Sequence, residues 1–101
     1  GWLECPANPW KDRWTWHPDF PNGFGVALCC PAIVADLNGD GKGDLIVGNA
    51  HGYGLDWYEQ KSEGGKRVWV KHPIDPFNGQ FHDMQWVDID GDGKPELVTG
   101  K

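Results

Sequence analysis

The stretch Asp36-Leu-Asn-Gly-Asp-Gly-Lys-Gly-Asp44 decides the fold of this chain, because it recurs almost position by position as Asp88-Ile-Asp-Gly-Asp-Gly-Lys-Pro-Glu96. In both copies, oxygen-bearing side chains stand at positions 1, 3, 5 and 9, and glycine stands at position 6, where the backbone must turn sharply. Position 7 offers a main-chain carbonyl, and this set of oxygens is the ligand pattern of a calcium loop. The sequence therefore predicts two calcium sites, with the ligands Asp36, Asn38, Asp40, Lys42 and Asp44 in the first loop and Asp88, Asp90, Asp92, Lys94 and Glu96 in the second.

The residues around these loops predict strands. EF-hand loops carry Glu at position 12 and lie between helices, whereas position 12 is Val47 or Thr99 here. The first loop is flanked by 31–35 and by 45–47, two short runs rich in β-branched residues and typical of strands. An acidic turn without a metal remains the alternative for either loop alone. Two copies in the same register favour calcium at both.

The composition limits the size and class of the fold. A chain of 101 residues holds one domain's worth of material at most, and its net charge of −6 argues against nucleic-acid binding, which requires a basic patch. Seven Trp, 15 Gly and 8 Pro favour short strands and tight turns, and no apolar stretch approaches the roughly 18–20 residues of a membrane span. The chain begins with Gly and shows no signal peptide, which suggests a processed chain or an excised piece. Because such loops are most useful in millimolar calcium, we expect a secreted protein, extracellular or periplasmic.

Three cysteines leave two arrangements open. Cys5 can pair with Cys29 or Cys30 in an oxidising compartment, or the three can be buried thiols. Adjacent residues of a strand point to opposite faces, so at most one of Cys29 and Cys30 faces Cys5.

The internal similarity extends beyond the loops. Trp2 and Trp57 begin similar stretches, and His17 and His72 both precede proline; each pair is 55 residues apart, close to the 52 that separate the two loops. A period near 50 made only of strands predicts propeller blades of four antiparallel strands. Because His17 and His72 occupy equivalent positions in the two repeats, we expect both to have a structural role. In the order of one blade, the expected strands are 27–35 and 84–87, then 45–49 and 97–99, then 2–5 and 55–59, then 13–17 and 68–72.

This order makes the chain one whole blade between two halves. We expect an all-β fold of about two repeats, divided into half blade 1–20, full blade 24–75 and half blade 80–101. Two blades do not close a ring, because propellers contain roughly 4–8. The half blades would leave strand edges exposed, and exposed edges recruit other strands. The expected partners are therefore other copies of the chain, as a trimer or a tetramer, or the rest of a longer propeller.

The calcium loops, their flanking strands and the segment Trp57-Tyr-Glu59 resemble the FG-GAP/VCBS family of propeller repeats, which includes the integrin alpha-chain head and fungal propeller lectins. The likeness covers most of the chain; Phe24-Gly25 is kept, whereas Cys30-Pro31 replaces the Gly-Ala-Pro part of the family's pattern. It implies β-propeller blades with calcium on the bottom face and ligands on the top face. The segment 81–93 also resembles a branch of sugar dehydratases, in which propeller histidines help to form a metal-containing site.

Mapped onto this chain, the resemblance places the turns 20–24, 51–54 and 75–83 on the top face. Aromatic rings stack on sugar faces while amides and carboxylates bind hydroxyls, so a carbohydrate site is physically reasonable there. The implied ligand-binding residues are His51, Tyr53, Phe81, His82 and Asp83. His51 and His82 are also the catalytic candidates, as metal ligands or as a proton-transfer pair. The alternative for each is a loop histidine bonded to backbone.

These features lead us to expect a calcium-stabilised binding or scaffold module for carbohydrate or another cell-surface ligand. One alternative is an enzyme of the sugar lyase or dehydratase type with a His-containing metal site. Another is a structural unit that assembles into a ring. The sequence contains no Ser-His-Asp order, phosphate loop or CxxC motif, which disfavours the enzyme.

Overall fold

The chain folds entirely into strands and connections. The computed structural model describes residues 1–21 and 32–100, and every regular element in these ranges is a strand. The described residues contain no helix that is long and apolar enough to cross a membrane. The strands are β1 (Trp2–Glu4), β2 (Thr15–His17), β3 (Ala32–Ala35), β4 (Asp44–Gly48), β5 (Tyr53–Glu63), β6 (Lys66–Gly79), β7 (Asp83–Val87) and β8 (Glu96–Gly100).

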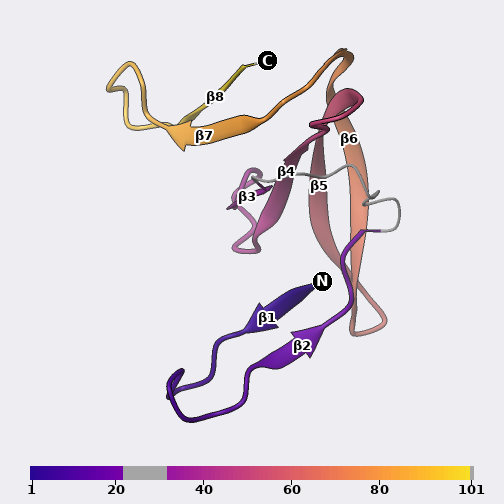
Figure 1. Ribbon diagram of the computed structural model, residues 1–101, viewed down its shortest axis with the longest axis vertical. Coiled ribbons are helices and arrows are strands. Elements are labelled where there is room, and N and C mark those ends of the chain that lie inside the picture. Colours follow the sequence, from indigo (N-terminus) through magenta and orange to yellow (C-terminus); the bar gives the residue numbers. More distant parts are fainter. Residues whose placement is uncertain (22–31, 101) are drawn as a thin grey trace.

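The strands form three antiparallel sheets. The central sheet has the order β3-β4-β5-β6, so each strand pairs with its neighbour in sequence. The pairs β1-β2 and β7-β8 are separate two-stranded hairpins, which we call the N-terminal and the C-terminal hairpin. Figure 1 shows the central sheet between the two hairpins, and the described strands do not close into a ring.

The core is built around β4, which is buried along its whole length. Its apolar run Leu45–Val47 lacks the alternation of a half-buried strand, because both faces of the strand are covered. On one face, Ile46 packs with Phe81 and Met84 of the C-terminal side. On the other face, Leu45 and Val47 pack with Tyr58, against Phe20 and Trp69. β4 therefore holds both flanking parts of the chain to the central sheet.

β5 and β6 are longer than the sequence analysis predicted. They contain 11 and 14 residues and pair from Glu63↔Lys66 to Tyr53↔Gly79, with register shifts near Leu55. The expected top-face turn 75–83 was therefore wrong in extent, since most of it belongs to β6. β6 is the edge strand of the sheet, a position in which prolines are tolerated because one side of the strand has no ladder to donate to.

The repeat is visible as matching side-chain contacts. The rings of Trp2 and His17 stack with centroids 4.1 Å apart, and those of Trp57 and His72 stack at 4.4 Å. In each case, the histidine Nε2 lies 2.8–2.9 Å from a glutamate carboxylate on the neighbouring strand. The two histidines thus occupy equivalent places between strands, where they join a tryptophan and an acid.

Candidate metal centre

Two acidic loops connect paired strands: the first loop, residues 36–44, joins β3 to β4, and the second loop, residues 88–96, joins β7 to β8. The position-1 carboxylate of each accepts backbone N–H bonds from positions 4, 5 and 6. These bonds measure 2.8, 3.0 and 2.8 Å at Asp36, and 2.7, 3.1 and 2.8 Å at Asp88. The two loops therefore wrap in the same way around their first aspartate.

The match continues through the middle of each loop. The position-3 side-chain oxygen accepts a bond from the N–H of position 5, at 3.1 Å for Asn38 and 3.0 Å for Asp90. The position-5 carboxylate accepts one from the N–H of position 7, at 2.9 Å for Asp40 and 2.8 Å for Asp92. The glycines at positions 4 and 6 have φ between 75° and 87° in both loops, a conformation that other residues adopt only with strain.

Position 9 is where the loops differ. Asp44 is completely buried, and its two oxygens accept bonds from the Leu37 N–H at 3.1 Å and from the Gln60 N–H of β5 at 2.9 Å. Glu96 is only partly buried, and it accepts a bond from Ile89 N–H at 2.9 Å. The first loop is thus bonded to the central sheet at this position, whereas the second is bonded to itself.

The second loop brings together three carboxylates that could hold an ion. Oxygens of Asp88, Asp90 and Glu96 all lie within 4.8 Å of one another. Oxygen ligands lie about 2.4 Å from calcium, so oxygens around one ion are at most about 5 Å apart. Each carboxylate oxygen that accepts one N–H bond keeps a further lone pair for a cation. The donor set, oxygen throughout, suits a hard cation such as calcium.

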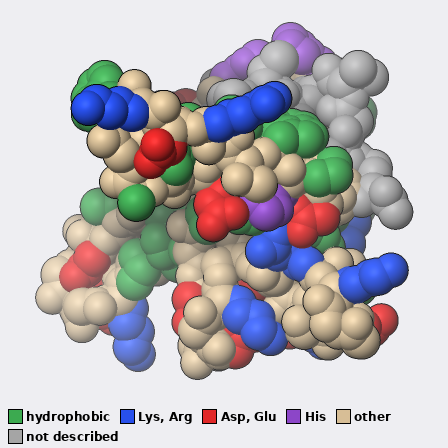
Figure 2. Space-filling view, turned by 90° about the horizontal axis from the view of Figure 1, so that it is seen from below, with side chains coloured by type: hydrophobic (Ala, Val, Ile, Leu, Met, Phe, Trp, Pro, Cys, Tyr) green, Lys and Arg blue, Asp and Glu red, His purple; other side chains and the backbone are tan. Residues whose placement is uncertain are grey.

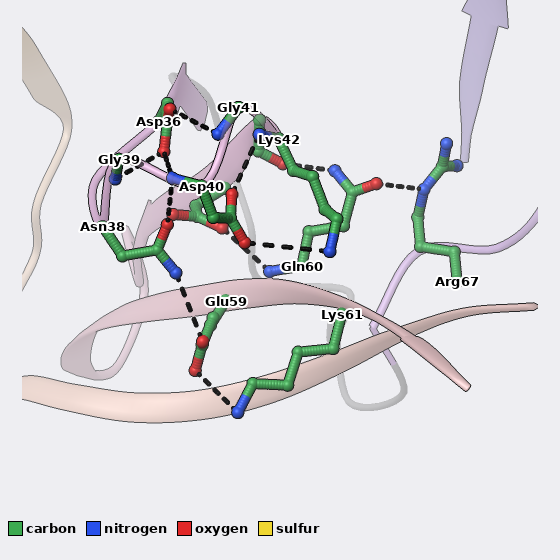
Figure 3. Close-up of polar contacts among 12 residues, drawn as sticks. Asp36, Asn38, Gly39, Asp40, Gly41, Lys42, Glu59, Gln60, Lys61 and Arg67 are labelled. Carbon is green, nitrogen blue, oxygen red and sulfur yellow. Dashed lines mark hydrogen bonds and ion pairs between the residues drawn. The ribbon is translucent and has the colours of Figure 1, made fainter.

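The first loop carries less negative charge and has more protein partners. Its position 3 is the neutral Asn38, and the Lys42 ammonium lies 3.8 Å from the Asp40 carboxylate. The Asn38 amide also donates to Glu59 on β5 at 3.2 Å, as Figure 3 shows. Glu59 in turn accepts from His72 and Lys61; the His72 bond is the main reason why the pKa of Glu59 lies below its usual value of 4.5.

Sequence reasoning did not identify the residues of β5 that contact the first loop. Gln60 bonds to Asp44 through its backbone and to the Gly43 carbonyl through its side chain. Glu59 reaches the loop through Asn38. Neither belongs to the nine-residue motif, and both lie 16 or more residues from their partners, so no local pattern signals them.

The expected top-face residues fall into two groups. The rings of His51 and His82 meet edge to face with centroids 5.7 Å apart. Tyr53 is 78% exposed beside His51, where both line a shallow pocket of about 280 Å³. Phe81, in contrast, is 5% exposed and packs in the core. Asp83, the first residue of β7, is exposed, and its carboxylate accepts a bond from the N–H of Met84, the next residue, at 2.9 Å.

The top-face pocket is shaped by a close approach of two backbones. Gly79 lies so near the Gly52 carbonyl that a Cβ on it would be 2.2 Å from that oxygen. Gln80 follows with φ of 61°, which is uncommon for a residue with a side chain.

The Cys5 thiol is exposed. Its expected partners, Cys29 and Cys30, lie outside the described residues.

One face of the molecule carries mixed charges. Seen from below, Lys and Arg side chains alternate with Asp and Glu, with hydrophobic side chains exposed among them (Figure 2).

Comparison with known proteins identifies a family. A family model described as FG-GAP-like repeat matches residues 36–99, which is more than half of the chain and includes both loops. Comparisons with curated proteins and with solved structures give no match.

Proposed function

We propose, on the premise that the chain belongs to the FG-GAP-like repeat family, that it is a propeller binding module whose two loops hold calcium. Modules of this family are generally β-propeller binding domains, and their repeats often bind calcium. The observation that carries the proposal is the bond-by-bond match of the two loops, together with the carboxylate cluster of the second.

Calcium would be held by oxygens alone. In each loop, the side chains at positions 1, 3, 5 and 9 and the carbonyl of Lys42 or Lys94 would supply the ligands. The bound ion would neutralise carboxylates that repel one another, and so stabilise the strand pair that each loop joins. Sites of this kind suit the millimolar calcium outside the cytosol, which supports an extracellular or periplasmic location for the protein.

Calorimetric titration tests the calcium proposal. We expect two sites for calcium, weaker binding of magnesium, and a higher melting temperature with calcium than with chelator. A site present at 100 times its dissociation constant adds about 2.7 kcal/mol of stability. Asp40→Ala and Asp92→Ala should each remove one site. An identical melting temperature in calcium and in chelator would exclude the proposal.

The top-face pocket is the proposed ligand site. Tyr53 and His51 line this pocket, and the exposed ring of His82 contacts His51 from outside the lining, a combination suited to the face and hydroxyls of a sugar. Tyr53→Ala and His82→Ala should abolish binding to a glycan array while leaving calcium binding unchanged. Loss of glycan binding in Asp92→Ala alone would place the ligand on the calcium face instead.

The contact between His51 and His82 favours an enzyme as the second candidate function. Two imidazoles whose centroids lie 5.7 Å apart can share a metal ion or exchange protons with one substrate. A third metal bound in the presence of saturating calcium, lost in His51→Ala and accompanied by turnover of a sugar, would favour the enzyme. Binding to glycans without turnover would favour the binding module.

Further strands would complete the two hairpins. Leu3 is 55% exposed where its counterpart Tyr58 of the central sheet is 7% exposed, and Val98 is 39% exposed where Ile46 is 2% exposed. Other copies of the chain, three for six blades or four for eight, would cover these side chains, and so would neighbouring blades of a longer polypeptide. Native mass spectrometry of the 101-residue chain distinguishes the two sources, since only self-assembly gives the mass of three or four chains.

A further inference from the structure

We propose that Gln60 is a positioning residue that couples metal binding in the first loop to the docking of the N-terminal hairpin. The inference rests on the proposed calcium function of that loop and extends it to a part of the molecule that contributes no ligand. Gln60 lies on β5, and its backbone and side chain contact both the end of the first loop and Arg67 of β6.

The first contact of Gln60 is with the end of the first loop. The Gln60 N–H donates to Asp44 Oδ1 at 2.9 Å, and its side-chain Nε2 donates to the Gly43 carbonyl at 2.5 Å. Asp44 is the position-9 ligand, and Gly43 directly follows the position-7 carbonyl of Lys42. By holding both residues, Gln60 fixes the end of the loop before the ion arrives, which reduces the ordering that binding must bring about.

The second contact of Gln60 is with Arg67 on β6. The other end of the Gln60 amide, Oε1, accepts a bond from Arg67 Nε at 2.8 Å, as Figure 3 shows. The same guanidinium donates through Nη1 to Asp19 at 2.6 Å and lies over the ring of Trp2, 5.1 Å from its centroid. Arg67 therefore connects Gln60 to the N-terminal hairpin.

Asp19 completes this connection, which we call the hairpin joint: Trp2, Asp19, Arg67 and Trp69. Its carboxylate accepts from Trp2 Nε1 at 3.0 Å as well as from Arg67, and its carbonyl accepts from Trp69 Nε1 at 2.7 Å. Asp19, two residues after the end of β2, thus bonds to β1 of the hairpin and to β6 of the central sheet. The side chains of Arg67 and Asp19 are 28% and 36% exposed, so water competes only partly for these bonds.

The coupling follows from the use of both ends of one amide. Nε2 is bonded to the loop and Oε1 to the joint, so rotation of the amide loses both bonds together. A cation that orders Gly43 and Asp44 would hold the amide in place and thereby fix Arg67. Because coupling between sites is reciprocal, calcium should strengthen the joint by the factor by which the joint strengthens calcium binding.

The test isolates the first loop. In an Asp92→Ala background, in which the second loop is disabled, calcium affinity is measured by calorimetry. Hydrogen exchange of peptides covering β1, β2, β4 and β7 is then followed with and without calcium. We expect calcium to slow exchange in β4 and in the N-terminal hairpin. Gln60→Ala should weaken calcium binding about 10-fold, as loss of a group that orients metal ligands commonly does, and should remove the effect on the hairpin. Gln85→Ala, a matched change at an exposed position of β7, should alter neither.

Arg67→Met keeps Gln60 on the loop but cuts its link to the joint. We expect its calcium affinity to fall less than that of Gln60→Ala, while calcium no longer slows exchange in the hairpin. If the hairpin still responds to calcium in this variant, the proposed coupling is wrong. If calcium binds and protects β4 but never the hairpin, the coupling fails while the calcium function stands. Absence of calcium binding in the Asp92→Ala background overturns both.

Discussion

The first and second loops have nearly the same sequence and the same internal hydrogen bonds, but their surroundings differ. The first lies between two strands of the central sheet, and β5 bonds to its last residue; the second closes a hairpin that has no further strand beside it among the described residues. The first has a neutral Asn38 and a lysine near Asp40, whereas the second has four carboxylates. A repeated motif therefore specifies its own conformation, while its stability depends on what packs against it and its charge on single substitutions such as Asn38.

The largest difference should appear in the cores beside the loops. Ile46 is 2% exposed on β4, and its repeat counterpart Val98 on β8 is 39% exposed. Ile46→Ala should lower the free energy of unfolding by about 2–5 kcal/mol, because it opens a cavity in close-packed surroundings. Val98→Ala should cost less than about 1 kcal/mol, because the side chain is already partly in water. Urea denaturation measures both, and equal losses would show that the hairpin is as well packed as the central sheet.

The next difference concerns position 9. Asp44→Ala should leave the partly buried N–H groups of Leu37 and Gln60 without their acceptor, at a cost of about 2–4 kcal/mol even without calcium. Glu96→Ala exposes one N–H to water and should cost below about 1 kcal/mol. Both values are measured in chelator, so that metal affinity does not enter. Asp44→Asn, which keeps an acceptor, serves as the control; if Asp44→Ala proves as mild as Glu96→Ala, the anchoring of the first loop is not structural.

The parts that could be predicted from the sequence are those set by short-range pattern. Positions 1 to 9 of each loop form a local unit, so the strands on either side and the gathering of Asp88, Asp90 and Glu96 could be predicted from residue types alone. The extent of β6 could not be predicted, because it depends on pairing with β5 across a bulge. Prolines at 73 and 76 are residues typical of turns, so the sequence predicted a turn there. The contacts of Gln60 could not be predicted either, since they join residues that are distant in sequence. The family resemblance implied a ligand-binding role for Phe81, and only the packing around β4 places its side chain in the core.

Ionic strength should separate the two loops by a smaller amount. The four carboxylates of the second loop, three of them exposed, attract calcium more strongly than the three of the first loop, one of which is fully buried and one of which lies 3.8 Å from the Lys42 ammonium. Salt screens exposed charges over a distance of about 10 Å at 0.1 M and over shorter distances at higher concentration. Raising the salt concentration from 0.01 M to 1 M should therefore weaken calcium binding more at the second loop than at the first. Titrations of Asp40→Ala and Asp92→Ala, each with one remaining loop, measure the two sites separately. Parallel salt dependences would indicate that the surroundings do not change the charge that the ion meets.

The smallest expected effect is the pH dependence of the hairpin joint, which Gln60 links to the first loop and which has no such link to the second loop among the described residues. Burial raises the pKa of Asp19, but the bond from Trp2 and the charge of Arg67 outweigh it, and the pKa lies below its usual 3.8. A carboxylate with a lowered pKa stabilises the fold at any pH above its unfolded value, and this contribution is lost as the pH falls below 3.8 through the folded value. The difference in unfolding free energy between the unmodified chain and Asp19→Asn should therefore be constant near neutral pH and shrink below 3.8. Asp12→Asn, an exposed change in the connection between β1 and β2, provides the matched control and should follow the unmodified chain throughout. A difference that stays constant down to the acid limit would mean that the Asp19 carboxylate does not hold the hairpin to the central sheet through its charge.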